Sequence, residues 1–169
     1  MFHNLFFSFI YNSFFESHLR YTCQISAHKN GFSRIFRLQK QCLRLITFSK
    51  FNASSSPLFL NLRVLKLPHF VKLLNVCLIC SVLSKTAPTV LINVYNLKMY
   101  TDSHNTRGNS LGLIARPICR TFQYGINSIV YQSLVQWNEL QLLYPGLDLS
   151  NFSTNKLTKL YKSITFSGY

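Results

Sequence analysis

Apolar residues recur at helical spacing through most of the chain, and residues 33–48 form a predicted helix with two distinct sides. The apolar side of this helix consists of Ile35, Leu38, Cys42, Leu45 and Ile46. The opposite side carries Arg34, Arg37, Lys40 and Arg44. Ser33 is placed to cap its start. The pattern predicts a helix that buries one side in protein and presents a row of cations on the other.

The same periodicity predicts further helices. Their ranges are residues 5–24, 58–65, 69–84, 89–97 and 129–143, followed by a last helix that starts after Ser150 and has a basic face. β-branched residues favour short extended segments at 113–116 and 118–122 instead. We therefore expect a small, mainly α-helical domain with a short β element near residues 113–129.

Three regions follow from this pattern. Residues 1–97 form a helical region that contains the basic helix 33–48. Residues 98–112 have few core-forming residues and two glycines, which is typical of an exposed loop. Residues 113–169 form a C-terminal region with a Trp-Asn segment and the final helix.

The charge balance changes the picture. The chain has 18 lysines and arginines against four acids, a formal net charge of +14, and ten of the cations lie between Arg20 and Lys72. A chain this basic repels itself, and a bound polyanion relieves that repulsion. Nucleic acid is the first candidate and an anionic membrane surface the second. A solvated surface face is the plain alternative for the cations of residues 33–48.

The small number and wide spacing of the acidic residues exclude several classes of catalysis. They stand singly at Glu16, Asp102, Glu139 and Asp148, whereas two-metal phosphoryl transfer needs clustered carboxylates. No Gly-rich phosphate loop is present. Cys77 and Cys80 form a single C-x-x-C in an apolar run with no second pair, which favours a core role over zinc. We expect no catalytic residue, metal, cofactor or small-molecule substrate.

The N-terminal stretch is rich in phenylalanine, but it is too short and too interrupted for a membrane span, which needs about 20 apolar residues. It also lacks the basic start and the cleavage site of a signal peptide. We expect a buried helix there and an intracellular protein of the cytoplasm or nucleus. A small basic membrane-associated protein stays open as an alternative.

Five segments, in order, carry a family resemblance that covers most of the chain. A helix with a Ser-His-Leu-x-Tyr core is carried by Ser17, His18, Leu19 and Tyr21. The stretch RLQKQCLRLITF, with PLFLNL after it, resembles a Leu-Gln-Lys-x-x-Leu-Arg-Ile-Ile helix and a Pro-Leu-Phe-x-x-Leu segment. A His-x-x-Asn/Thr-Arg loop is carried by His104, Asn105, Thr106 and Arg107.

The last two segments lie in the C-terminal region. A Tyr-x-Gly-x-x-x-Trp-Asn-x-Leu segment is carried by Tyr131, Trp137, Asn138 and Leu140, with Ser133 in place of the glycine. NFSTNKLTKLYKS is similar to a closing Phe-Lys-x-x-Leu-Lys helix. Together the segments resemble the C-terminal, thumb and post-thumb region of the reverse transcriptases of LINE-type, jockey-like non-LTR retrotransposons.

The resemblance implies a helical region that grips RNA or an RNA–DNA hybrid by its backbone and packs on the palm and fingers of a parent polymerase. Arg34, Arg37, Lys40 and Arg44 would contact phosphates, with Arg107 as a further contact. The resemblance begins beyond the palm aspartates, so the family's RNA-directed DNA polymerase activity is not expected of this chain alone. A decayed fragment of the transposable element with no retained activity is the competing hypothesis.

Overall fold

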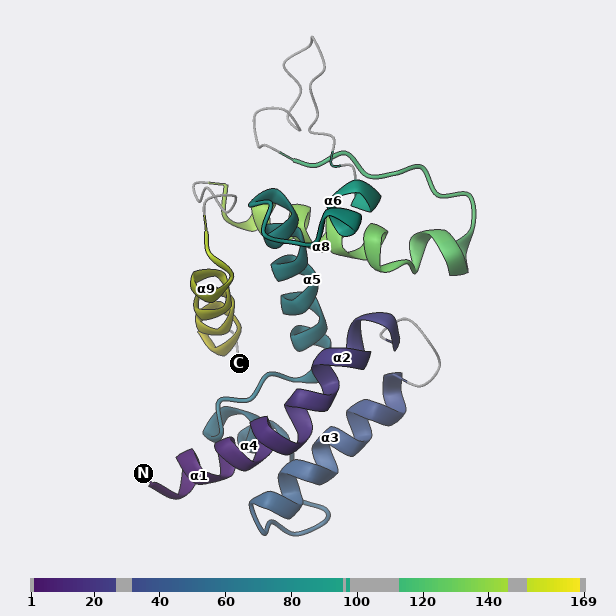
Figure 1. The fold of residues 1–169 in the computed structure, drawn as a ribbon. Helices are drawn as coiled ribbons and strands as arrows, with labels where there is room; N and C mark the ends of the chain where they lie inside the picture. Colours follow the sequence, from purple (N-terminus) through teal and green to yellow (C-terminus); the bar gives the residue numbers. More distant parts are fainter. Residues whose placement is uncertain (1, 27–31, 96, 98–112, 146–151, 168–169) are drawn as a thin grey trace. The chain divides into compact units, whose positions relative to one another are not determined.

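The computed structural model describes residues 2–26, 32–95, 97, 113–145 and 152–167, and within these ranges it is mainly helical, as predicted (Figure 1). The chain divides into two compact units. One consists of Met1–Val71 with Tyr161–Tyr169, and the other of Lys72–Leu160. The division falls inside a helix rather than at residues 98–112, which lie outside the described residues, so the loop expected there stays a prediction.

The first unit begins with a long helix that contains a wider turn. It consists of α1 (Phe2–Tyr11), the π-helical turn η1 (Asn12–Glu16) and α2 (Ser17–Ser26). Its buried residues Tyr11, Leu19 and Cys23 are spaced by eight and then by four, so each spacing is a multiple of four. In an α-helix of 3.6 residues per turn, each step of four drifts by about 40°. The wider π turn takes up this drift and keeps these side chains on one side.

Two further helices complete the first unit's core. α3 (Phe32–Ile46) lies beside α1, and α4 (Ser56–Asn61) follows after a loop (Figure 1). The buried cluster that these elements share consists of Tyr11, Leu43, Phe59, Leu62 and Val64. α3 starts one residue before Ser33, so this serine lies in the first turn and not at the N-cap, contrary to the prediction.

Three helix ends share an unusual feature. Phe48, Arg63 and Lys85 have positive φ values of 51°, 51° and 56°. At each, two backbone bonds close the helix end in the Schellman pattern, as where Phe48 N–H donates to Leu45 and Ser49 N–H to Arg44. Glycine normally occupies this left-handed position because it has no Cβ to clash. The chain closes these helices without it, and the predicted end of the basic helix at residue 48 is therefore two residues late.

The second unit is organised around α5 (Leu67–Leu83), which begins in the first unit and is buried nearly all round. α6 (Thr89–Tyr95) and α8 (Ile129–Leu143) follow it. Polar side chains join these helices inside the unit. The Asn75 amide donates to Gln136 across 2.9 Å, and the hydroxyls of Tyr95 and Ser133 lie 3.0 Å apart. Ser133 thus makes a buried contact that a glycine at this position lacks.

The short β element predicted near residues 113–129 is wrong. Residues 113–121 contain no strand beyond an isolated bridge at Ile114, and the π-helical turn η2 (Phe122–Ile126) follows them. The Asn138 side chain holds the segment instead: it accepts from Ile114 N–H at 3.0 Å and donates to Ile114 C=O at 2.8 Å. A side-chain amide therefore satisfies the two backbone groups that a neighbouring strand would have satisfied. Trp137 beside it is buried, in agreement with a packing role.

The last helix, α9 (Thr154–Ser167), starts later than predicted. Ser153 accepts from Lys156 N–H at 3.4 Å and so occupies the cap, whereas Ser150 lies outside the described residues.

The C-x-x-C pair contacts this region. The Cys80 thiol donates to Phe152 C=O at 2.9 Å, and Cys77 lies 3.7 Å from the Thr158 hydroxyl. Across the described ranges, no helix has the length and apolar character needed to cross a membrane.

Candidate nucleic-acid interface

The orientation of α3 is set by one buried glutamine. Gln39 has no exposed surface, yet its amide is fully engaged. Its nitrogen donates to the Tyr11 hydroxyl at 2.7 Å and to Leu65 C=O at 2.9 Å, and its oxygen accepts from Leu67 N–H at 2.9 Å. Buried polar groups are tolerated when their bonds are satisfied in this way. Gln39 therefore fixes which side of α3 faces the core.

This orientation corrects the predicted apolar side of α3. Leu38 is 50% exposed and Leu45 76% exposed, although both were assigned to the buried side. The fully buried residues are Gln39 and Leu43. Ile35, Cys42 and Ile46 of the predicted side are partly buried, and the last two pack against the core cluster. The predicted apolar side included Leu38 and Leu45 and left out Leu43. The hydrogen bonds of Gln39 turn Leu43 toward the core instead, and a hydropathy pattern does not contain these bonds.

The four predicted cations of α3 do not form a single row. At 3.6 residues per turn, Arg37, Lys40 and Arg44 lie within about 60° of one another, and Arg34 lies about 60° further round. Arg34 and Arg37 are exposed and make no hydrogen bond or ion pair with any residue in the described ranges. These two guanidinium groups keep all their donors for an external acceptor.

The other two cations of α3 are partly engaged. The Lys40 ammonium lies 4.2 Å from the centroid of the Phe36 ring, in a cation–π contact that leaves its charge intact. Arg44 Nε donates to Ala53 C=O at 3.0 Å, which fastens the loop after α3 to the end of the helix. Both side chains are half-buried. They extend the positive surface but also serve the fold.

Carboxylates do not neutralise this surface in the described part of the chain. Glu16 pairs with Arg20 at 2.7 Å, and Glu139 pairs with Lys72 at 3.5 Å, so each described acid already has a cation of its own. The remaining predicted contact, Arg107, lies outside the described residues and stays a prediction.

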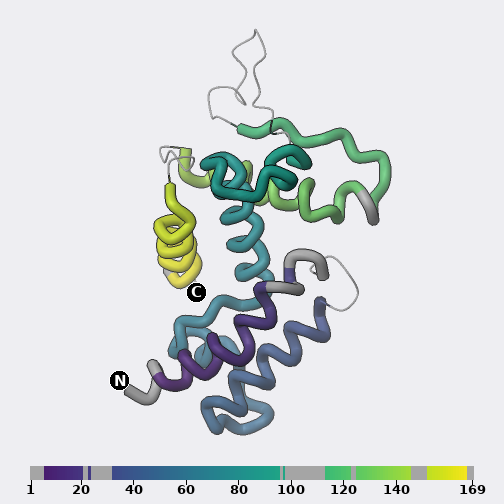
Figure 2. The backbone as a smooth tube through the Cα atoms, viewed as in Figure 1, coloured from purple at the N-terminus to yellow at the C-terminus, as the bar shows by residue number. Residues whose placement is uncertain are grey.

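Sequence reasoning missed one part of this surface. The loop after α3 carries Lys50 between two exposed aromatic side chains, Phe48 and Phe51. Figure 2 traces the backbone of this loop from the end of α3 toward α4. The signal was present in the sequence as a lysine flanked by phenylalanines. It was assigned to the end of the helix and to a polar connection because no glycine marks the turn.

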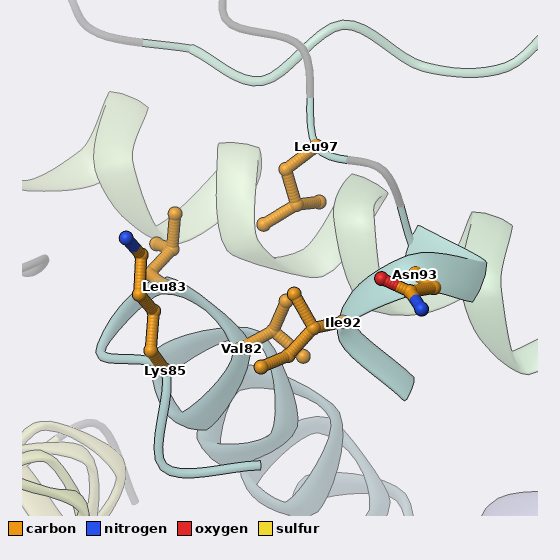
Figure 3. Close-up of a pocket in the computed structure, with 6 residues that line it drawn as sticks. All are labelled: Val82, Leu83, Lys85, Ile92, Asn93 and Leu97. Carbon is orange, nitrogen blue, oxygen red and sulfur yellow. The ribbon is translucent and has the colours of Figure 1, made fainter. Parts of the chain in front are cut away.

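The second unit contains a shallow pocket of about 520 Å³ between the end of α5 and α6 (Figure 3). Its lining consists of Val82, Leu83, Lys85, Ile92, Asn93 and Leu97. The polar side chains of Lys85 and Asn93 stand apart, with apolar side chains between them (Figure 3). The lining contains no acid, histidine or cysteine, so we assign it no chemistry.

The buried cysteines are protected from ionisation. Burial raises the pKa of the Cys23 thiol from 9.0 to about 11, and it also raises the pKa of Cys42. Burial, together with the neighbouring Cys77, raises the pKa of Cys80. Thiols are nucleophiles and metal ligands as thiolates, so these groups are suited to packing. Within the described ranges, no three metal-binding side chains come together.

Comparisons with protein-family models, with curated proteins and with solved structures gave no match to this chain. The candidate interface therefore depends on the geometry of α3 and on its charge.

Proposed function

We propose that the chain is a non-catalytic C-terminal fragment of a LINE-type non-LTR retrotransposon reverse transcriptase that binds RNA or an RNA–DNA hybrid through its backbone. The observation that carries the binding is the pair Arg34 and Arg37. Both are exposed on a helix whose opposite side is buried, and neither has an acceptor in the described part of the chain.

The physical argument has two parts. A helix held rigidly by its buried side presents its cations at fixed spacing, which suits the regular charge of a phosphate backbone. Guanidinium groups also bind phosphate oxygens with paired hydrogen bonds. Such contacts position a nucleic acid without reading its sequence. The proposed setting is the cytoplasm or nucleus, where such a ligand is found, and the proposed protein partners are the palm and fingers of the parent polymerase.

The test is binding to an RNA–DNA hybrid across a salt series. The Arg34→Gln, Arg37→Gln variant removes two exposed charges from α3. The matched control, Lys156→Gln, Lys159→Gln, removes two exposed charges from α9 and leaves the same net charge. If both arginines contact phosphates, the first variant lowers the log–log salt slope by about one unit or more, because each contact contributes roughly 0.7–0.9.

Two results would contradict the proposal. One is an equal loss of slope in both variants, which would mean that only net charge matters. The other is absence of binding by the folded chain at low salt, which would favour a decayed fragment with no retained activity. The exposed side chains of Phe6, Phe9 and Phe14 are the specific observation behind that second candidate, because they are apolar surface of the kind that packs on a larger protein.

A further inference from the structure

Backbone contact by the arginines does not account for the two aromatic side chains at the end of α3. Phe48 is 88% exposed and Phe51 is 76% exposed. Phe48 also has a φ of 51°, a conformation that is unfavourable for a residue with a Cβ. Both the backbone conformation of Phe48 and the exposure of its apolar ring to water are therefore unfavourable. A ligand that covers the ring would offset part of this cost.

The loop that carries these rings is held in place by several bonds. Arg44 Nε binds Ala53 C=O, and Ser49 N–H donates to Arg44 C=O at 2.9 Å. The hydroxyls of Thr47 and Ser49 lie 2.8 Å apart. The Phe48 ring contacts the Phe7 ring, with 6.4 Å between centroids and 65° between planes. The loop is thus fastened at both ends, and the Phe48 ring is supported from one side.

The charges around the rings indicate the kind of ligand. Lys50 is exposed between the two phenylalanines in sequence, and Arg37 is exposed on the helix that leads to them. At a rise of 1.5 Å per residue, Arg37 lies about 14 Å along the axis from the last residue of α3. A strand of a few nucleotides can span this distance. Cations beside exposed aromatic rings are the combination that single-stranded nucleic acids require.

We infer that the C-terminal end of α3 binds single-stranded RNA or DNA, with bases stacked on Phe48 and Phe51 and phosphates held by Lys50 and Arg37. The inference rests on the proposed function and names its substrate class. Only unpaired bases expose a face for stacking, because in a duplex both faces are covered by neighbouring pairs. A single-stranded stretch beside a hybrid is therefore the ligand that this surface fits.

The test compares three ligands of equal length: oligouridine, the same chain with abasic riboses in place of its bases, and an RNA–DNA duplex. We expect the full-length protein to bind oligouridine more tightly than it binds the abasic strand. The Phe48→Leu, Phe51→Leu variant keeps apolar surface but loses both rings, and it should bind oligouridine about tenfold or more weakly at an unchanged salt slope. Its affinity for the abasic strand should not change.

Exposed phenylalanines elsewhere provide the matched control. The Phe9→Leu, Phe14→Leu variant makes the same substitution at residues that are 69% and 74% exposed on α1 and η1. It should bind oligouridine like the wild type. All four residues lie largely in solvent, so each variant is expected to fold, which circular dichroism and urea unfolding check.

The outcomes separate this inference from the proposed function. If the two Phe variants bind oligouridine alike while Arg34→Gln, Arg37→Gln still lowers the salt slope, the stacking inference is wrong and the backbone proposal stands. If neither bases nor arginines affect binding, both are wrong. Vesicles of phosphatidylserine and phosphatidylcholine provide the last arm. If Phe48→Ser, Phe51→Ser abolishes vesicle binding and leaves oligouridine binding unchanged, the rings belong to a lipid-binding surface and the inference is overturned.

Discussion

Gln39 and Tyr11 lie 28 residues apart in the chain and are joined by a 2.7 Å hydrogen bond between two buried side chains. The same amide binds the backbone at Leu65 and Leu67, so one side chain links α1, α3 and the start of α5. Burial raises the pKa of the Tyr11 hydroxyl, and the bond from Gln39 opposes this only in part. The tyrosine is therefore kept neutral inside the first unit.

Replacing this glutamine should destabilise the fold strongly. In Gln39→Leu, an apolar side chain fills the space but leaves Leu65 C=O and Leu67 N–H buried without that partner. Each such group costs about 1–3 kcal/mol, so we expect a loss of roughly 2–6 kcal/mol in the free energy of unfolding. Urea unfolding measures it. Gln41→Leu, a half-buried position on the same helix, is the control, and an equal effect at both positions would contradict the assignment.

At the left-handed helix ends, a substitution is expected to stabilise the fold. Arg63 has a φ of 51°, so Arg63→Gly should stabilise the chain by about 1 kcal/mol as the Cβ clash is removed. Arg37→Gly removes the same side chain from the interior of α3 and should destabilise by about 1 kcal/mol. The two variants have equal net charge. Thermal unfolding should shift in opposite directions for them, and a shift in the same direction would argue against a left-handed cap at Arg63.

Alkaline pH should weaken the fold. The folded-state pKa of Cys23 is about 11 against an ordinary value of 9.0, because burial disfavours the thiolate. The unfolded chain therefore loses this proton first, and stability falls as pH rises from about 9 to about 11. The pKa values of Tyr11 and Tyr95 are also raised by burial and act in the same direction. Urea unfolding at several pH values should show a shallower fall in Cys23→Ala than in wild type, and parallel curves would contradict this.

The Asn138 contact can be tested by proteolysis. Asn138→Ala removes both bonds to Ile114, and we expect a loss of about 2 kcal/mol together with faster tryptic cleavage after Arg120. Asn155→Ala is the control, because it makes the same change at an exposed helical position. Equal cleavage rates in the two variants would mean that Asn138 does not hold the segment.

Local sequence was sufficient for some elements and not for others. α8 has the predicted bounds, because Ser128 caps it, accepting from Tyr131 N–H at 3.2 Å, and apolar residues recur at helical spacing after it. The π turn in the first helix was not predicted, since apolar spacings of four also fit an α-helix. The ends at Phe48 and Lys85 could not be placed accurately because they lack the glycine that normally marks them.

The candidate site was predictable in composition but not in geometry. The sequence identified Arg34 and Arg37, and both are exposed. It could not identify which leucines of α3 are buried, because that depends on partners of Gln39 that are distant in sequence. It also missed Phe48 and Phe51, whose exposure depends on how the loop folds back on the helix.

The pairing of Asn138 with Ile114 has a consequence for how the chain folds. The connection from α6 to α8 is long, and the entropy lost on closing a loop grows with its length. The contact at Ile114 fixes one point of this connection, so that the stretch from Ile114 to α8 is a shorter loop with its own closing step. This shorter loop can close as soon as α8 forms. Folding of the second unit is therefore expected to proceed from α8 outward.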